Sequence, residues 1–328
     1  MKRILHMVAV LAALAVVSGC TPSPKKMDSI TVAYAPFESV SLVYVAQAQN
    51  MFADNGLRVT YRKYDTGVGA LEGVQKGEAD IAVGTAEYPL VGRAFQEVPV
   101  SAIASIDRPD FIYLIGRKDR GVEKPSDLKG KRIGTVAGSI AQFYLGRFLE
   151  LNDMTAEDIT FVDVKTPDEW RAAIANGDVD AVVLAQPEAS LVKARLGSNA
   201  TFFSVQGSQP AYSLAIATNE WISGNPAAVR KFLSALADAE EFVAGNPAET
   251  RAIIQKRLGL DSDYMDLVET QNTFALSLDQ SLIIAMEDEA RWMINNRITP
   301  KKEVPDFSDY VHTAGLKKVK PDAVNIIR

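Results

Sequence analysis

The stretch from residue 130 to residue 151, GKRIGTVAGSIAQFYLGRFLEL, predicts a strand, a tight turn and a helix in succession. Residues 132–136 are typical of a short buried strand, and residues 140–151 carry an apolar stripe at helical spacing. Gly138 permits a close turn, and Ser139 is a good N-cap residue. The first N–H groups of the helix would face a cleft at the carboxyl end of the strand, where a carboxylate or sulfonate would suit them. An ordinary α/β connection with a capped helix is the alternative.

The N-terminus predicts export. Lys2 and Arg3 precede an apolar run from residue 4 to residue 17, which is too short to span a bilayer. The next residues, Val17-Ser18-Gly19-Cys20, resemble the bacterial lipobox, in which Cys20 would become the lipidated first residue. We therefore expect a signal peptide at 1–19, a lipid-anchored tether at 20–28 and attachment to the cell membrane; secretory cleavage without an anchor is the alternative.

Composition favours a globular protein of two domains. The 328 residues are 47% hydrophobic and 23% charged, and Cys20 is the only cysteine, so no disulfide or cysteine metal site is expected within the chain. Removing Lys2 and Arg3 from the 35 basic residues leaves 33 against 41 acidic ones, without long runs of one sign. This charge balance argues against nucleic acid as a partner.

Strands and helices alternate through the first third of the chain, which predicts a mainly parallel sheet covered by helices. The expected strands are 29–35, 57–61, 80–83 and 98–106, and a helix is expected from Val40 to about Ala53.

The pattern then repeats. The segment KGEADIAV around Gly77 matches NGDVDAVV around Gly177, 100 residues later, and residues 31–40 match residues 132–141 as strand, loop and helix. Two matches at nearly one spacing indicate two similar lobes, although any α/β protein contains such junctions.

A helical region follows residue 225 and has to pack on a lobe that is already folded. We therefore expect lobe 1 at 29–112 and 217–328 and lobe 2 at 113–216. Strands near 110–117 and 212–218 would then cross between the lobes as a hinge.

The order of these segments resembles the substrate-binding proteins of ABC importers, and specifically the nitrate, sulfonate and taurine branch that includes proteins for a thiamine pyrimidine precursor. The resemblance rests on DLKGKRIG at 127–134, YRKYDTG at 61–67, SLDQSL at 277–282 and the closing segment 309–323. It implies a two-lobed α/β periplasmic-binding-protein fold of type II, in which each lobe is a mainly parallel sheet flanked by helices and two crossings form the hinge. It also implies a monomer that serves a permease and an ATPase, with no cofactor or metal.

Such proteins hold the ligand on loops at the carboxyl ends of strands. The resemblance places these loops at Phe37, Glu38, Ser39, Val40, Thr85, Glu87, Tyr88, Asp107 and Arg108 on lobe 1, and at Gly138, Ser139, Ile140, Gln186, Glu188 and Tyr212 on lobe 2 and the return crossing. Hydroxyl groups, turn amides and aromatic faces suit a small polar or anionic organic solute, such as a sulfonate, taurine, an aminopyrimidine or an aromatic heterocycle.

The carboxylates in this set would repel an anion unless the ligand also carries a cationic or amide N–H end, as a zwitterion or an aminopyrimidine would. Glu38, Glu87, Asp107 and Glu188 are therefore expected mostly at the cleft rim or at helix caps, with no more than about two touching the ligand. Arg108 has two interpretations: it could bind a carboxylate or sulfonate with two hydrogen bonds, or pair with Asp107 or Asp110. Tyr144, Trp170 and Trp221 are expected to be packing residues.

Other functional classes fit less well. The fungal pyrimidine synthases of the same fold family use a histidine and an iron site beside a cysteine-rich motif, whereas only His312 remains here after signal cleavage and no cysteine cluster is present. No Gly-x-Ser-x-Gly motif is found either. We therefore expect a binding protein and not an enzyme; a ligand sensor for a membrane receptor is the alternative.

Overall fold

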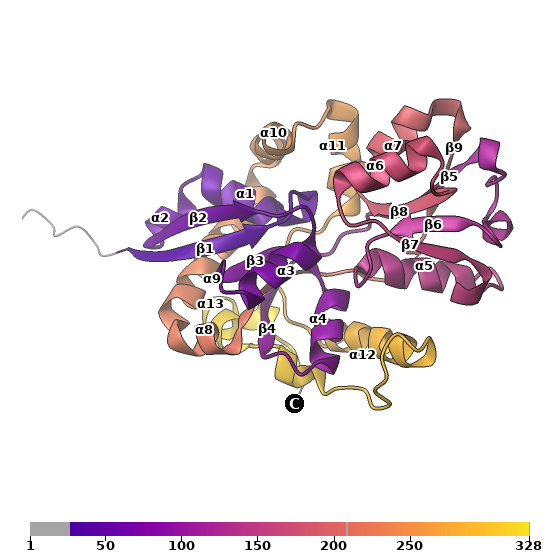
Figure 1. Cartoon of the computed structure of the whole chain (residues 1–328). Coiled ribbons are helices and arrows are strands. Elements are labelled where there is room, and N and C mark those ends of the chain that lie inside the picture. The colour runs from indigo at the N-terminus through magenta and orange to yellow at the C-terminus, as the bar shows by residue number, and fades with distance from the viewer. Residues whose placement is uncertain (1–26, 208, 328) are drawn as a thin grey trace, which may run out of the picture.

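The computed structural model describes residues 27–207 and 209–327 and contains two five-stranded sheets, each flanked by helices (Figure 1). Sheet A has the order β2-β1-β3-β10-β4, and sheet B has the order β7-β6-β8-β5-β9. The strands of sheet A are β1 Asp28–Tyr34, β2 Leu57–Lys63, β3 Ile81–Ala86, β4 Val100–Asp107 and β10 Ser213–Thr218. Those of sheet B are β5 Ile112–Arg117, β6 Arg132–Thr135, β7 Thr160–Asp163, β8 Ala181–Ala185 and β9 Ala200–Ser204. We call sheet A with its helices lobe 1, and sheet B with its helices lobe 2.

The helices fall into a lobe 1 set, a lobe 2 set and a C-terminal set. Lobe 1 carries α1 Ser41–Ala48, α2 Met51–Asp54, α3 Gly67–Gln75 and α4 Glu87–Phe95. Lobe 2 carries α5 Ile140–Glu150, α6 Pro167–Asn176 and α7 Glu188–Leu196. The C-terminal set is α8 Asn219–Gly224, α9 Pro226–Gly245, α10 Pro247–Leu258, α11 Ser262–Gln271, α12 Gln280–Asn295 and α13 Ala314–Val319. Short 3₁₀ helices are η1 Glu38–Val40, η2 Lys118–Arg120, η3 Pro125–Leu128, η4 Ala156–Asp158, η5 Gly197–Asn199, η6 Phe307–Tyr310 and η7 Pro321–Ala323.

The two sheets are built alike, as the repeated sequence pattern predicts. In each, three parallel strands occupy one side, and the fourth position is taken by a strand antiparallel to its parallel neighbour: β10 beside β3 in sheet A and β5 beside β8 in sheet B. Each of these antiparallel strands is the first strand after the chain has passed from the other lobe. The predicted two-lobed α/β fold with two crossings is confirmed.

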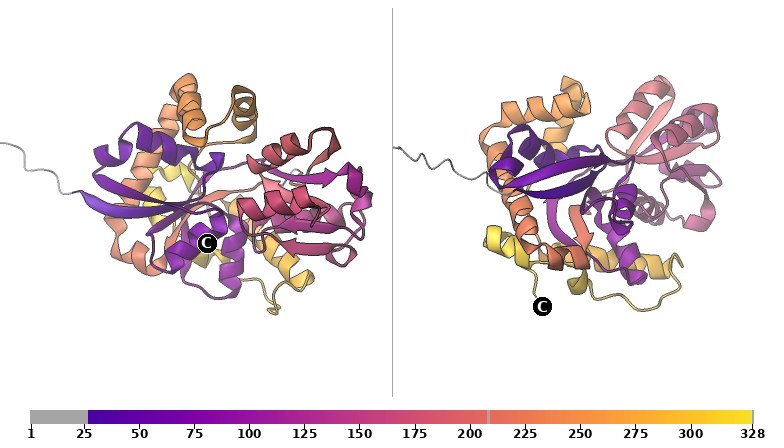
Figure 2. Two further views of the ribbon diagram at one scale, coloured as in Figure 1. Left: turned by 45° about the horizontal axis from the view of Figure 1, so that its top comes forward. Right: turned by 60° about the vertical axis from the view of Figure 1, so that its left-hand side comes forward.

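The crossings lie just before these strands and not along them. Since β4 ends at Asp107 and β5 begins at Ile112, the first crossing is residues 108–111; the second lies between Ser204 and Ser213. The expected lobe 2 boundary at residue 216 therefore falls inside β10. Figure 2 shows the lobes side by side in two further views, with α8, α9 and α13 on the side of lobe 1 remote from lobe 2.

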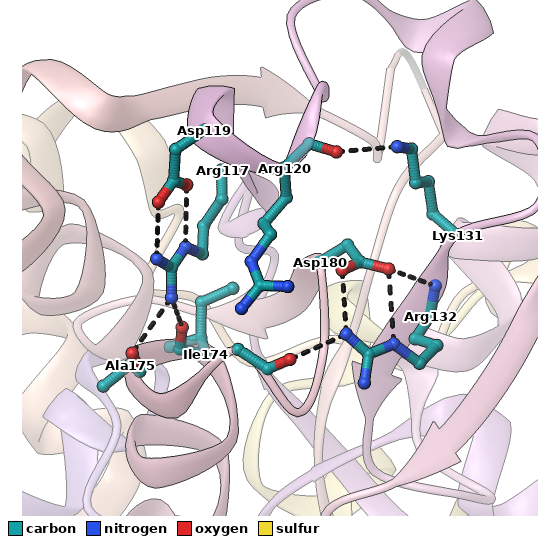
Figure 3. A network of polar contacts seen from close by, with 9 residues as sticks. Arg117, Asp119, Arg120, Lys131, Arg132, Ile174, Ala175 and Asp180 are labelled. Atoms are coloured by element: carbon teal, nitrogen blue, oxygen red, sulfur yellow. Dashed lines mark hydrogen bonds and ion pairs between the residues drawn. The ribbon is translucent and has the colours of Figure 1, made fainter.

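A polar network closes the end of sheet B that is remote from the carboxyl end of β8 (Figure 3). The carboxylate of Asp180 accepts the backbone N–H of Arg132 at 2.9 Å and pairs with its guanidinium at 3.0 Å. Arg117 pairs with Asp119 at 2.7 Å and donates to the carbonyls of Ile174 and Ala175 at the end of α6. These contacts fix the amino ends of β6 and β8, so the opposite end of the sheet is where a ligand can be accommodated.

The C-terminal helices pack on lobe 1 and reach lobe 2. The rings of Phe52 in α2 and Phe232 in α9 stack at 5.7 Å inside lobe 1. From lobe 1, α12 extends beside α4 and below α5 (Figure 1), where Trp292 meets the ring of Phe143 at 5.4 Å and donates through Nε1 to Glu150 at 2.9 Å. Within the described residues, every helix is too short or too polar to cross a membrane.

Several element predictions need adjustment. The helix expected from Val40 to about Ala53 is two helices, because Asn50 adopts a left-handed backbone with φ of 60° and ends α1 before α2 begins. The predicted signal peptide, Cys20 and most of the tether lie outside the described residues. Asp28, expected at the end of the tether, is already in β1 and pairs with Lys231 at 2.8 Å.

Candidate functional site

A pocket lies between the carboxyl ends of the parallel strands of the two sheets and is bordered by both crossings. It encloses about 720 Å³ of space free of protein atoms, part of it open to solvent. Its lining is mostly apolar and comes from both lobes: Phe37, Ser39, Thr66, Gly67, Val68, Gly84, Ala86, Pro89, Pro109, Phe111, Ile112, Thr135, Val136, Ser139, Ile140, Ala141, Trp170, Val183, Leu184, Ala185, Glu188, Tyr212 and Ser213. Because the two sheets supply opposite walls, a ligand held here would be enclosed by relative movement of the lobes.

The N-terminal ends of four helices border the pocket. They are represented in its lining by Gly67 of α3, Ala86 before α4, Ile140 of α5 and Glu188 of α7. The first N–H groups of a helix have no partner inside it and carry partial positive charge. Four such ends at one pocket favour an electron-rich ligand group.

The start of α5 is the most open of these ends. Ile140 and Ala141 line the pocket, and their backbone N–H groups have no acceptor among the described residues. Ser139 is the N-cap residue, as predicted, but its hydroxyl donates to the carbonyl of Val136 at 2.7 Å and does not cap the helix. Gly138 has φ of 72°, and its N–H donates to the side chain of Gln142 at 2.7 Å. The turn is therefore held by its own hydrogen bonds, while the amides after it are available.

Trp170 and Glu188 form a fixed wall on the lobe 2 side. The carboxylate of Glu188 accepts two hydrogen bonds from Arg171, at 2.7 and 2.9 Å, and one from Nε1 of Trp170 at 3.3 Å. The charge of Glu188 is thus balanced by Arg171, and the indole ring is oriented by its N–H. Trp170, expected to be a packing residue, is nearly buried and also lines the pocket.

The structure divides the predicted site residues into two groups. Those that line the pocket are Phe37, Ser39, Ser139, Ile140, Glu188 and Tyr212. Those that do not line it are Glu38, Val40, Thr85, Glu87, Tyr88, Asp107, Arg108, Gly138 and Gln186. Most of the second group is buried behind the wall, where several of its members hold the loops in place, whereas Arg108 and Gly138 are exposed.

Thr85 and Gln186 are examples of such supports. The hydroxyl of Thr85 donates to the carbonyl of Gly67 at 2.8 Å, which ties the end of β3 to the start of α3. The side chain of Gln186 accepts the backbone N–H of Ser190 at 3.1 Å and so caps the first turn of α7. Val40 is fully buried in the core of lobe 1.

Three of the four carboxylates are buried and do not lie at the cleft rim, so the expectation of rim acids is wrong for them. Glu38 is 1% exposed and Asp107 is 0% exposed, and Tyr264 donates its hydroxyl to Glu38 at 2.8 Å. Burial raises the pKa of Glu38 above its ordinary value, and burial together with the nearby Glu38 raises the pKa of Asp107.

The third buried carboxylate is Glu87 of α4. It contacts the carboxyl group of Glu289 in α12, a residue outside the predicted set. The two carboxyl groups lie in hydrogen-bonding contact, and Glu87 accepts the backbone N–H of Tyr212 at 3.0 Å. Burial is the main cause that raises the pKa of Glu87 to about 8, and burial with the charge of Glu87 raises the pKa of Glu289. Both shifts favour the protonated form of this carboxyl pair.

Arg108 does not pair with Asp107 or Asp110, as one of its two interpretations had it, and it does not line the pocket. Its guanidinium pairs with Asp279, at the start of α12, and lies over the ring of Tyr212 at 5.4 Å. Tyr212 lines the pocket and donates its hydroxyl to Ser281 at 2.8 Å. Arg108 therefore helps to hold the side chain of Tyr212, which lines the pocket, in its position.

Tyr88 belongs to an aromatic cluster between the lobes. Its ring lies 5.7 Å from that of Phe143 in α5 and 6.2 Å from that of Trp292 in α12. Its side chain is almost fully buried, so it contributes to lobe contact and not to the pocket surface.

The predictions missed several pocket residues. Thr66, Gly67 and Val68, at the start of α3, follow the carboxyl end of β2, and this position along the chain is the signal that could have placed them at the cleft. Phe111 and Pro109 lie in the first crossing, which was expected further along the chain. Trp170 could not be found this way, because a tryptophan inside a predicted helix carries no signal of which cavity it borders.

Comparison with known proteins identifies relatives. The family model described as NMT1/THI5 like matches residues 38–250. The chain is 26% identical over 217 residues to the taurine-binding periplasmic protein of Escherichia coli, which covers 65% of this chain and 66% of that protein. It is 28% identical over 223 residues to the 4-amino-5-hydroxymethyl-2-methylpyrimidine phosphate synthase of Aspergillus parasiticus, which covers 61% of each chain.

The fold has close counterparts among solved structures. The alkanesulfonate-binding protein SsuA from Xanthomonas axonopodis pv. citri bound to MOPS superposes with a TM-score of 0.77, at 19% sequence identity over 88% of this chain and 99% of that one. This likeness shows that the two lobes form a periplasmic-binding-protein fold.

Proposed function

The chain belongs to the NMT1/THI5-like family, and on that premise we propose that it is an extracytoplasmic solute-binding protein that captures a small anionic organic solute between its lobes. The observation that carries the proposal is the pocket between two similar sheets, at which four helix N-termini meet. Neutral hydroxyl and amide donors can hold an oxyanion there through hydrogen bonds and the helix dipoles.

The ligand class follows from the lining. Among the residues that line the pocket none is lysine, arginine or histidine, and the one carboxylate, Glu188, is balanced by Arg171. A small oxyanion without an apolar part would leave most of this lining without a partner. A sulfonate or carboxylate with an aliphatic or aromatic body satisfies both parts of the pocket. The related taurine-binding and alkanesulfonate-binding proteins favour a sulfonate.

Binding without chemistry is the favoured activity. No histidine or cysteine lines the pocket, and no group of three or more residues able to ligate a metal is found within the described part of the chain. Synthase relatives keep an enzymatic pyrimidine function as the second candidate. That function would require a reactive group that the pocket lining does not supply.

Delivery to an ABC importer completes the proposal. The partners would be a permease and an ATPase, and the Val17-Ser18-Gly19-Cys20 sequence supports a lipid anchor that holds the monomer at the outer face of a membrane. Presentation of the bound ligand to a membrane receptor is the alternative use of the same lobes.

Thermal unfolding with a ligand panel is the test. Butanesulfonate, benzenesulfonate, taurine, nitrate, aminopyrimidines, flavins and aromatic carboxylates would be compared, because a bound ligand raises stability by RT ln(1 + [L]/Kd). We expect a sulfonate or carboxylate with an apolar body to give the largest shift. Small-angle scattering with that ligand should show a more compact particle. Turnover of an aminopyrimidine without any anion binding would contradict the proposal.

A further inference from the structure

A pair of buried carboxyl groups stands behind the pocket wall, where the chain returns from lobe 2. Glu87 and Glu289 are 0% and 2% exposed, and Oε2 of Glu87 accepts the N–H of Tyr212 at 3.0 Å. Oε1 of Glu87 and Oε2 of Glu289 have no partner among the described residues beyond the contact between the two carboxyl groups. Two carboxylate oxygens cannot bond to each other without a hydrogen, so a proton between them is the arrangement that satisfies both.

The Glu87–Glu289 pair lies close to the pocket. Glu87 is the first residue of α4, and its neighbours Ala86 and Pro89 line the pocket, as does Tyr212, whose N–H it holds. A negative charge on Glu87 would oppose the positive end of α4 and repel an anion across a single layer of residues. A neutral Glu87 leaves the helix end free to attract the anion.

The charged groups around the Glu87–Glu289 pair do not take the place of the proton in neutralising it. The ionisable groups that face it are Asp288 in α12, Tyr88 in α4, Tyr144 in α5 and Tyr212, with Arg108 over the ring of Tyr212 and paired with Asp279. Arg291 of α12 lines the same groove as Glu289 and pairs with Glu287. Within the described chain, neither Glu87 nor Glu289 pairs with a cationic side chain.

A second cavity adjoins the pair on the side away from the pocket. A surface groove of about 690 Å³ between α5, the return crossing and α12 is lined by Phe143, Gln209, Asp288 and Glu289 among others. Glu289 lines this groove although its side chain is only 2% exposed, and Glu87 lies against the pocket wall.

We infer that the Glu87–Glu289 pair must keep its proton for an anion to be held in the pocket, so that anion binding takes up a proton whenever the pair is partly ionised. The inference rests on the proposed function. Because burial raises the pKa of Glu87 to about 8, affinity should be highest below that pH and should fall as the pH rises through it.

Substitution by glutamine tests this directly. In Glu87→Gln, the amide oxygen can still accept the N–H of Tyr212 while the amide nitrogen donates to Glu289, so the variant imitates the protonated state. Titration calorimetry with butanesulfonate would be run from pH 6 to pH 9.5 in buffers of different ionisation enthalpy. We expect wild type to lose about thirtyfold in affinity between pH 6 and pH 9.5, and the number of protons taken up on binding should grow toward one as the pH rises through about 8. Glu87→Gln and Glu289→Gln should lose this pH dependence. Glu287→Gln, a partly exposed acid on the same helix paired with Arg291, should behave as wild type.

The outcomes separate the two proposals. Binding with the same pH dependence in wild type, Glu87→Gln and Glu289→Gln would overturn the proton linkage alone. Infrared spectra of ligand-free protein at pH 7 should contain a protonated carboxyl band that both glutamine variants diminish. Its absence from wild type would also overturn the linkage. Failure of every anion of the panel to bind at any pH, with the band present, would overturn the proposed function and the linkage with it.

Discussion

Asp80 and Asp180 make the same contact at equivalent places in the two lobes. The carboxylate of Asp80 accepts the backbone N–H of Thr31 at 2.7 Å, and that of Asp180 accepts the N–H of Arg132 at 2.9 Å. The backbone N–H of each aspartate donates in return to the carbonyl of the same partner at 2.8 Å. A four-atom clamp therefore joins β1 to β3 in sheet A and β6 to β8 in sheet B, so the repeat in the sequence is also a repeat of backbone contacts.

Alanine at these aspartates should destabilise the protein. Asp80→Ala and Asp180→Ala each leave a partly buried N–H without an acceptor, which costs about 1–3 kcal/mol. Urea unfolding followed by circular dichroism would measure the loss. Asp168→Ala removes an aspartate whose side chain is 98% exposed and paired only at the surface, so it should change stability by at most about 1 kcal/mol. Equal losses in all three would argue against the clamp.

Gly138→Val should weaken ligand binding through the backbone. No atom lies within 4 Å of the Cβ that a side chain would add, so the substitution does not crowd the turn. Its cost is the left-handed φ of 72°, about 1–3 kcal/mol for a branched residue. Relaxation of the turn would shift the N–H groups of Ile140 and Ala141. Ser139→Ala loses only one hydrogen bond, to Val136, and should weaken binding less than tenfold.

Gly130 supplies the control for that experiment. It also has a left-handed backbone, with φ of 76° and nothing within 4 Å of its added Cβ, but it precedes β6 at the end remote from the pocket. Gly130→Val should therefore lower stability as Gly138→Val does and leave affinity unchanged. Calorimetric titration with butanesulfonate distinguishes them, and equal affinity in both would remove the start of α5 from the site.

Trp170 should decide how well the pocket accepts a ring. Trp170→Leu removes the aromatic wall, so affinity for benzenesulfonate should fall about tenfold while affinity for butanesulfonate changes little. Trp170→Phe keeps a ring but loses the N–H bond to Glu188, so an intermediate result is expected. Parallel loss for both ligands in Trp170→Leu would show that the side chain only supports the fold.

Glu38→Gln should stabilise the protein in alkaline solution. Since burial raises the pKa of Glu38 in the folded state, wild type pays a growing cost for ionisation as the pH rises above the unfolded value. The glutamine can still accept the hydroxyl of Tyr264. The free energy of unfolding, measured in urea at pH 5 and pH 8, should favour the variant more strongly at pH 8. A variant less stable than wild type by the same amount at both values would count against a neutral Glu38.

Cys20→Ser should release the protein from the membrane without altering ligand affinity. The cysteine follows the predicted signal peptide and precedes β1, so the two lobes do not require it. Membrane partition in cells and calorimetry on the purified protein would be compared. Retention of the variant in the membrane fraction would contradict the lipid anchor.

The sequence was sufficient for the architecture and for part of the pocket. Helix starts such as Asn225-Pro226 and Asn246-Pro247, and the repeat around Gly77 and Gly177, depend on local backbone preferences, which are visible in a single segment. The roles of Glu87 and Trp170 were not visible, because each depends on a partner that is distant along the chain or on a cavity formed by both lobes. Sequence position placed Glu87 at the right loop, and only packing shows that its carboxyl turns away toward α12.

The reach of α12 has a mechanical consequence. Trp292 of α12 contacts Phe143 and Glu150 in lobe 2, whereas the rest of the helix packs on lobe 1. Besides the two crossings, this side-chain contact therefore joins the lobes. Gln271 of α11 makes a further contact of this kind, because it donates to the hydroxyl of Tyr113 in β5. Separation of the lobes would have to break both contacts, so Trp292 and Gln271 should favour the closed arrangement and slow the release of a bound ligand.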